Sequence, residues 1–96
     1  MKIEMAIHHS RTLRDVKTQA RIESRIRRLS LGNMGDHKIL SGGIIELRLD
    51  FGQGYRVYCT RIGDRIILLL FGGDKSGQNR DIKKAREYLA DYKERA

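Results

Sequence analysis

The chain has 96 residues, which suits one domain over residues 1–96 and is too short for two. Its 20 Lys and Arg against 12 Asp and Glu give a net charge of +8, and 13 of the cations are Arg, the side chain best suited to bidentate contact with phosphate. A single cysteine excludes an internal disulfide framework and a cysteine-based zinc cluster. The longest apolar run has six residues, so we expect a soluble, cytoplasmic protein with a polyanionic partner and no membrane contact.

The first third of the chain predicts a strand and then helical structure. Residues 1–7 alternate apolar and other side chains, which indicates a short strand with one covered face, suited to a sheet edge. From Ser10 to Leu31 the apolar residues recur at helical spacing but on two nearly opposite sides. Either two helical pieces meet at a break near residues 15–18, which we favour, or one helix packs on two sides. Gly32-Asn33 is expected to end the helix.

Three strands and a last helix follow. Ile45–Leu49 and Tyr55–Thr60 alternate apolar with charged or polar residues, which predicts strands with one face toward water, joined by a glycine-containing hairpin. Arg65–Phe71 is apolar at every position past the first, so this strand is expected to be central and covered on both faces. A final helix begins near Ser76. The fold class is therefore α+β: a small antiparallel sheet of three to four strands, with N-terminal helices and a C-terminal helix.

Strand parity, given a suitable bulge in the hairpin loop, brings three cations together. Arg48 and Arg56 lie on adjacent strands near their shared hairpin, and Lys75 follows the central strand, whose end lies beside the start of the strand containing Arg56. Such convergence raises electrostatic repulsion, but it suits a phosphate that gains charge in a transition state. A solvated basic face explains the same pattern.

The segment Gly72–Ser76 lies between a strand and a helix, where backbone N–H groups can hold an anion. It lacks the spacing of a nucleotide-binding P-loop, and a plain turn with a helix cap is the alternative. Tyr58 shares the face of Arg56, where it could stack on a base or deliver a proton, unless it is a half-buried structural tyrosine. Cys59 lies on the apolar face as an inert core thiol. The three histidines have no metal-ligand spacing, so we expect no metal and no cofactor.

Two segments carry a resemblance to a known family. They are Gly52–Tyr58 and Leu68–Ser76, followed by Gln78, Arg80, Asp81 and Ile82. Together they resemble the HigB-like addiction module killer branch of the RelE/ParE toxins, over about residues 13–92. The resemblance implies a small twisted antiparallel sheet with two N-terminal helices and a C-terminal helix.

The resemblance also implies a function and its site. It implies a type II toxin–antitoxin system in which the toxin is an mRNA endoribonuclease, ribosome-dependent and metal-independent, held in a hetero-oligomer by a cognate antitoxin with a helix-turn-helix DNA-binding domain. Arg56, Arg48 and Lys75 match basic positions of the family. Asp81 falls where the family often has a proton-transfer group, so Asp81 or Tyr58 is the expected base.

The resemblance departs at the N-terminus, where twelve residues precede Leu13, fewer than a complete strand and helix need. A shortened toxin is therefore expected.

Two other functions remain open from the sequence. One is a ParE-like toxin that poisons DNA gyrase without cutting RNA, since one fold supports both activities. The other is a basic RNA-binding module without turnover, whose binding would weaken with salt.

Overall fold

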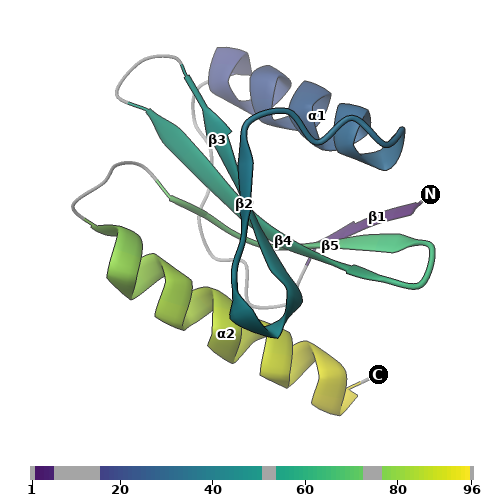
Figure 1. The fold of residues 1–96 in the computed structure, drawn as a ribbon, viewed down its shortest axis with the longest axis vertical. Helices are drawn as coiled ribbons and strands as arrows, with labels where there is room; N and C mark the ends of the chain where they lie inside the picture. The colour runs from purple at the N-terminus through teal and green to yellow at the C-terminus, as the bar shows by residue number, and fades with distance from the viewer. Residues whose placement is uncertain (1, 6–15, 51–53, 73–76, 96) are drawn as a thin grey trace.

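The structure is a computed structural model, and it describes residues 2–5, 16–50, 54–72 and 77–95. A five-stranded sheet in the order β1-β5-β4-β3-β2 lies between two helices, α1 on one face and α2 on the other (Figure 1). The elements are β1 (Lys2–Met5), α1 (Val16–Ser30), β2 (His37–Ile39), the 3-10 turn η1 (Ser41–Gly43), β3 (Ile44–Leu49), β4 (Tyr55–Ile62), β5 (Arg65–Gly72) and α2 (Gln78–Arg95). The predicted α+β class is confirmed.

Strands β2 to β5 form an antiparallel meander, of which the sequence predicted β3, β4 and β5. Strands β4 and β5 are joined by a two-residue turn in which Gly63 has a φ of 60°, a left-handed value that glycine adopts without steric cost. Strand β1 adds to the outer edge of β5 in the parallel direction, so the sheet is mixed rather than purely antiparallel. The long connection between these two strands permits the parallel pairing.

Helix α1 has already begun at Val16, so no helix break lies at Thr18. The first predicted helical piece and the possible cap at Asp15 fall within residues 6–15, which lie outside the described residues. The helix ends as predicted: Asn33 N–H donates to Arg28 O at 2.9 Å and Gly32 N–H to Leu29 O at 3.0 Å, with Gly32 at a φ of 92°. This pair of hydrogen bonds is a Schellman motif, which requires the left-handed residue that glycine supplies.

The sheet has a hydrophobic core on each face. Under α1 the core comprises Ile22, Ile26, Leu29, Ile45, Leu47, Leu49, Val57, Cys59, Ile66, Leu68 and Phe71. Under α2 it comprises Ile44, Tyr58, Ile67, Leu69, Leu70, Ala85 and Leu89. Strand β5 therefore supplies side chains to both cores, which confirms that it is an interior strand covered on both faces.

A β-bulge explains how β5 divides its side chains. Tyr58 pairs with Leu70 while the next residue, Cys59, pairs with Leu68, so Leu69 is the extra residue. Leu69 and Leu70 consequently both belong to the core under α2, and Phe71 returns to the core under α1. Gly72 then lies opposite Arg56.

Two sequence predictions about the sheet were incomplete or wrong. Strand β2 was not predicted, because all three of its residues are exposed and show no apolar alternation. The second face of β3 and β4, expected to meet water, is covered by α2, so that Glu46 is 0% exposed and Thr60 is 4% exposed. Within the described part of the chain, neither helix has the length and apolar character needed to cross a membrane.

Candidate functional site

The site is built on two arginines that face each other across neighbouring strands. Arg48 on β3 and Arg56 on β4 are direct partners in the antiparallel register, as strand parity predicted. The Arg48 side chain is 41% exposed and the Arg56 side chain 11% exposed, so one guanidinium reaches solvent and the other is largely enclosed. Like charges placed opposite each other on a sheet are destabilising unless something compensates them.

Glu46 supplies that compensation. This residue precedes Arg48 by two positions on the same face of β3, and its carboxylate is completely buried. Its Oε1 accepts a hydrogen bond from Arg48 Nε at 3.3 Å, and its Oε2 lies 3.9 Å from Arg56 Nε. A buried carboxylate next to two guanidinium groups fixes their positions and offsets part of their charge.

Helix α2 is tied to this carboxylate by its first residue. Gln78 Nε2 donates a hydrogen bond to Glu46 Oε2 at 2.8 Å. Neither residue was among the predicted site residues, although Gln78 is one of those that carry the family resemblance. The signal for Glu46 was its parity with Arg48, which places every second residue on one side of the strand.

Tyr58 is a core residue and not an exposed one. It is 0% exposed and belongs to the core under α2, so its ring is not accessible for the predicted stacking on a base in this structure. Its hydroxyl oxygen is buried and has no hydrogen-bond partner among the described residues. Burial raises the pKa of Tyr58, and the negative charges of Glu46 and Asp81 raise it further. The phenol therefore stays protonated at neutral pH, which suits a proton donor better than a base.

Asp81 lies in the first turn of α2 and is 3% exposed. A side chain at Gly72 would collide with the Asp81 carboxylate, so this acid packs directly against the backbone at the end of β5. Its Oδ1 is buried and has no hydrogen-bond partner within the described ranges. Asp81 and Tyr58 are neighbours of Gly72 from two sides, since Tyr58 Cε2 lies 3.6 Å from the position that a Gly72 Cβ would take.

The third predicted cation, Lys75, lies outside the described residues, as do Ser76 and most of the predicted anion-binding segment. The described part of that segment is Gly72, which pairs with Arg56 in the sheet. The chain thus leaves β5 directly beside Arg56, and Lys75 follows three residues later.

The arrangement brings together four of the five predicted residues, Arg48, Arg56, Tyr58 and Asp81, around a carboxylate that was not predicted. Chemically, the exposed part of Arg48 can contact a phosphate, while Arg56 contributes a positive charge that is largely shielded from solvent. Tyr58 holds a proton and Asp81 offers a carboxylate oxygen without a partner in the described structure.

Cys59 takes no part in this arrangement. It is completely buried under α1, its Sγ lies 3.8 Å from Ile45 O, and burial raises the pKa of its thiol to about 12. The prediction of an inert core thiol is confirmed.

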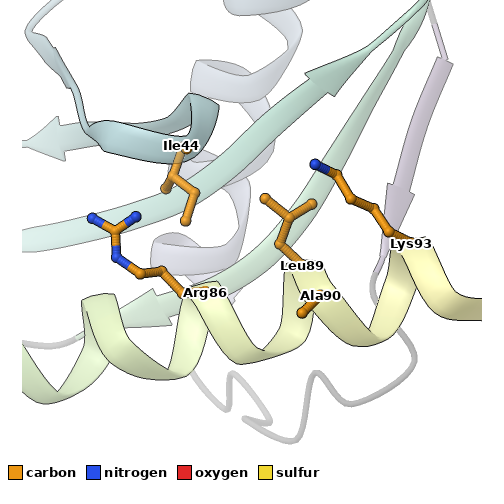
Figure 2. A pocket seen from close by; sticks show the side chains of 6 residues that line it. Ile44, Arg86, Leu89, Ala90 and Lys93 are labelled. Atoms are coloured by element: carbon orange, nitrogen blue, oxygen red, sulfur yellow. The ribbon is translucent and has the colours of Figure 1, made fainter.

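A separate concavity of about 280 Å³ lies between α2 and η1. Figure 2 shows Arg86 and Lys93 on either side of Leu89, with Ile44 facing Leu89 from the sheet. Arg86 Nη1 donates a hydrogen bond to Ser41 O at 2.5 Å and thereby joins the helix to the turn. None of the predicted site residues that the structure describes lines this concavity, and Arg86 joins the helix to the turn there.

Comparison with known proteins gives one informative match. No protein-family model matches the chain. No solved structure matches it either. An uncharacterized protein of Haemophilus influenzae is 50% identical over 74 residues, which cover 77% of this chain and 75% of that protein. At this identity and coverage, the chain belongs to the same family as the Haemophilus influenzae protein.

Proposed function

We propose that this chain is the toxin of a type II toxin–antitoxin system and acts as an endoribonuclease on mRNA at the ribosome, without a metal. The observation that carries the proposal is the direct pairing of Arg48 with Arg56 on neighbouring strands. Arg56 also pairs with Gly72, the last residue of β5, and Lys75 follows Gly72 by three positions in the sequence. Two guanidinium groups opposite each other repel, and here they need the buried Glu46 carboxylate to offset part of that repulsion. Such an arrangement is useful where a phosphate must be held and its growing charge neutralised. The resemblance of the sequence to the HigB-like toxins supports the same function.

The proposed reaction is transfer within the RNA backbone. The 2′-hydroxyl attacks the adjacent phosphorus, the bond to the 5′-oxygen breaks, and the products are a 2′,3′-cyclic phosphate and a 5′-hydroxyl. Arg56 and Lys75 stabilise the charge that develops on the phosphoryl oxygens, and Arg48 positions the phosphate. Asp81 accepts the proton of the 2′-hydroxyl, and Tyr58 gives a proton to the leaving oxygen.

Two of these groups are covered in the described structure. Tyr58 and Asp81 are buried beneath the start of α2, so their roles require the first turn of that helix to move when RNA binds. One link that holds this turn is the hydrogen bond from Gln78 to Glu46. Gln78→Ala should therefore change the rate of cleavage without removing any of the proposed reacting groups.

The test of the proposal is induction of the chain in a bacterial host, with growth measured and the 5′ ends of transcripts mapped. Wild type should arrest growth and produce new transcript ends with 5′-hydroxyl groups. Arg56→Ala should relieve the arrest, because loss of one contact that stabilises a developing charge costs roughly a hundredfold to a thousandfold in rate.

The matched control is Arg61→Ala, an exposed arginine of the same strand. It should leave arrest and cleavage unchanged, and circular dichroism should show both variants folded. Growth arrest with intact mRNA and double-strand DNA breaks would instead indicate gyrase poisoning. RNA that is bound but never cut would indicate a binding module.

The proposed partner is an antitoxin with a helix-turn-helix DNA-binding domain, encoded beside this chain and bound to it in a hetero-oligomer. Co-expression with the neighbouring open reading frame should abolish the arrest. Co-purification of the two chains tests the complex directly, and a toxic chain that no neighbour neutralises would contradict this part of the proposal.

A further inference from the structure

A second group of arginines lies on the other face of the sheet. Arg21, Arg25 and Arg28 of α1 and Leu49 and Asp50 at the end of β3 line a pocket of about 210 Å³, which we name the arginine pocket. This volume is several times the ~30 Å³ that one water occupies in the liquid, so a small polyatomic ion fits. Leu49 belongs to the core under α1, whereas Arg48 points to the opposite face, so the arginine pocket is distinct from the proposed cleavage site.

The helix itself brings the three arginines together. They are spaced four and three residues apart, which places them on one side of α1. Like charges at this spacing repel each other and weaken the helix, so their grouping does not serve helix stability.

Arg25 is fixed in place by the backbone. It is 7% exposed, its Nη1 donates to Arg48 O at 2.6 Å, and its Nη2 donates to Met34 O at 2.9 Å and to Asp36 O at 2.5 Å. These acceptors are uncharged carbonyl groups, so they hold the guanidinium without neutralising it.

The charges of Arg25 and Arg28 are therefore compensated only in part. Among the described residues, neither Arg25 nor Arg28 forms an ion pair with a carboxylate. Burial lowers the pKa of Arg25 and the nearby positive charge of Arg28 lowers it further, while the negative charge of Asp36 raises it in part. Among the described residues, the lining contains three arginines and one carboxylate, that of Asp50.

We propose that the arginine pocket binds a phosphate group. A tetrahedral phosphate carries up to two negative charges and several acceptor oxygens, which match the charge of the lining and the planar donor groups of arginine. The phosphate comes either from an RNA backbone or from a free or terminal phosphate, and both present the same oxygens. The inference rests on these residues alone and not on the proposed cleavage reaction.

The experiment is a titration of the full chain with inorganic phosphate at constant ionic strength, followed by amide chemical shifts in NMR. In the wild type, the shifts should move in a saturable way at α1 and around Leu49 and Asp50. Arg28→Gln should weaken binding about tenfold, the usual effect of losing one charge-assisted hydrogen bond. Asp50→Asn should tighten binding, because it removes the negative charge from the lining.

Arg27→Gln is the matched control, since Arg27 is exposed on the same helix and does not line the arginine pocket. It loses the same charge and should retain phosphate binding within about twofold. Arg25 is left unchanged in this test, because its carbonyl contacts make it part of the fold.

A short single-stranded RNA without terminal phosphates distinguishes the two sources. If the RNA competes with phosphate and Arg28→Gln weakens both, the arginine pocket takes a backbone phosphate. If only inorganic phosphate is affected, it takes a free or terminal phosphate. Equal losses in Arg27→Gln and Arg28→Gln, or shifts spread over the whole surface, would overturn the proposal in favour of general attraction to a basic protein.

Discussion

The buried carboxylate of Glu46 offers the sharpest test of how the site is held together. The change is Glu46→Gln, which keeps the size of the side chain and removes its negative charge. Arg48 Nε and Arg56 Nε approach different oxygens of the carboxylate. Glutamine replaces one of these oxygens by an NH2 group, so at least one arginine N–H then faces another donor instead of an acceptor. The variant should therefore lose both attraction and a hydrogen-bond acceptor.

The magnitude follows from the two distances. At 3.3 and 3.9 Å and an effective dielectric constant of about 20, the attractions are about 5 and about 4 kcal/mol before desolvation. Burying the carboxylate costs several kcal/mol, and Arg48, being 41% exposed, can turn to water. Arg56 remains enclosed with its Nε already lacking a hydrogen bond within the described structure. We expect a loss of about 3 kcal/mol in the free energy of unfolding, the lower end for breaking a buried ion pair.

The assay is urea denaturation followed by circular dichroism. A loss of about 3 kcal/mol should lower the urea midpoint by about 2 M and the melting temperature by roughly 12 to 24 °C for a chain of this length. Asp91→Asn makes the same carboxylate-to-amide change at the exposed ion pair with Arg95, which is 2.9 Å long, and should cost less than about 0.5 kcal/mol. If Glu46→Gln is no more destabilised than Asp91→Asn, then Glu46 does not compensate the two arginines and the reasoning is wrong.

Other changes have expected outcomes of their own. Arg25→Gln should cost about 3 kcal/mol by urea denaturation, because three backbone carbonyls lose their donor, whereas the exposed Arg27→Gln should be nearly neutral. Gly72→Ala should cost about 1 to 3 kcal/mol by overpacking against the Asp81 carboxylate, and the cost should shrink when Asp81→Ala is added; additive losses would contradict the contact. The Cys59 thiol keeps its proton in the folded state up to about pH 12, while the unfolded thiol loses it near 8.5, so the free energy of unfolding should fall as pH rises through this range. This part of the decline should be absent in Cys59→Ala, and an unchanged pH slope would show that the thiol does not contribute.

Much of the fold could be predicted because its signals are local. Alternation predicted β3 and β4, an unbroken apolar run predicted β5, and helical spacing predicted α2. The Gly32-Asn33 pair predicted the end of α1, because these residues readily adopt the left-handed backbone conformation that ends a helix. The parallel partner of β1 and the short exposed β2 depend on contacts between distant parts of the chain, and no local pattern records them.

The sequence predicted which residues of the site are neighbours, but it did not predict which of them are buried. Parity, together with an assumed bulge in the hairpin loop, placed Arg48 and Arg56 on the same face, because the period of a strand is fixed. Whether that face meets water depends on where α2 packs, and this decided the burial of Glu46 and Tyr58. An alternating polar face was interpreted as solvent-exposed, although a helix N-terminus with polar residues such as Gln78 can cover it.

Because of the bulge at Leu69, inserting or deleting one residue in β5 would change which core its later side chains enter. Up to Leu69, even-numbered residues of β5 belong to the core under α1 and odd-numbered residues to the core under α2. From Leu70 onward this assignment is reversed. Removing one residue between Leu68 and Phe71 would restore uniform alternation and shift the loop that follows by one position. Relatives of this chain that lack the extra residue are therefore expected to build the end of β5 differently, and an alignment of the family should treat this position as a structural marker.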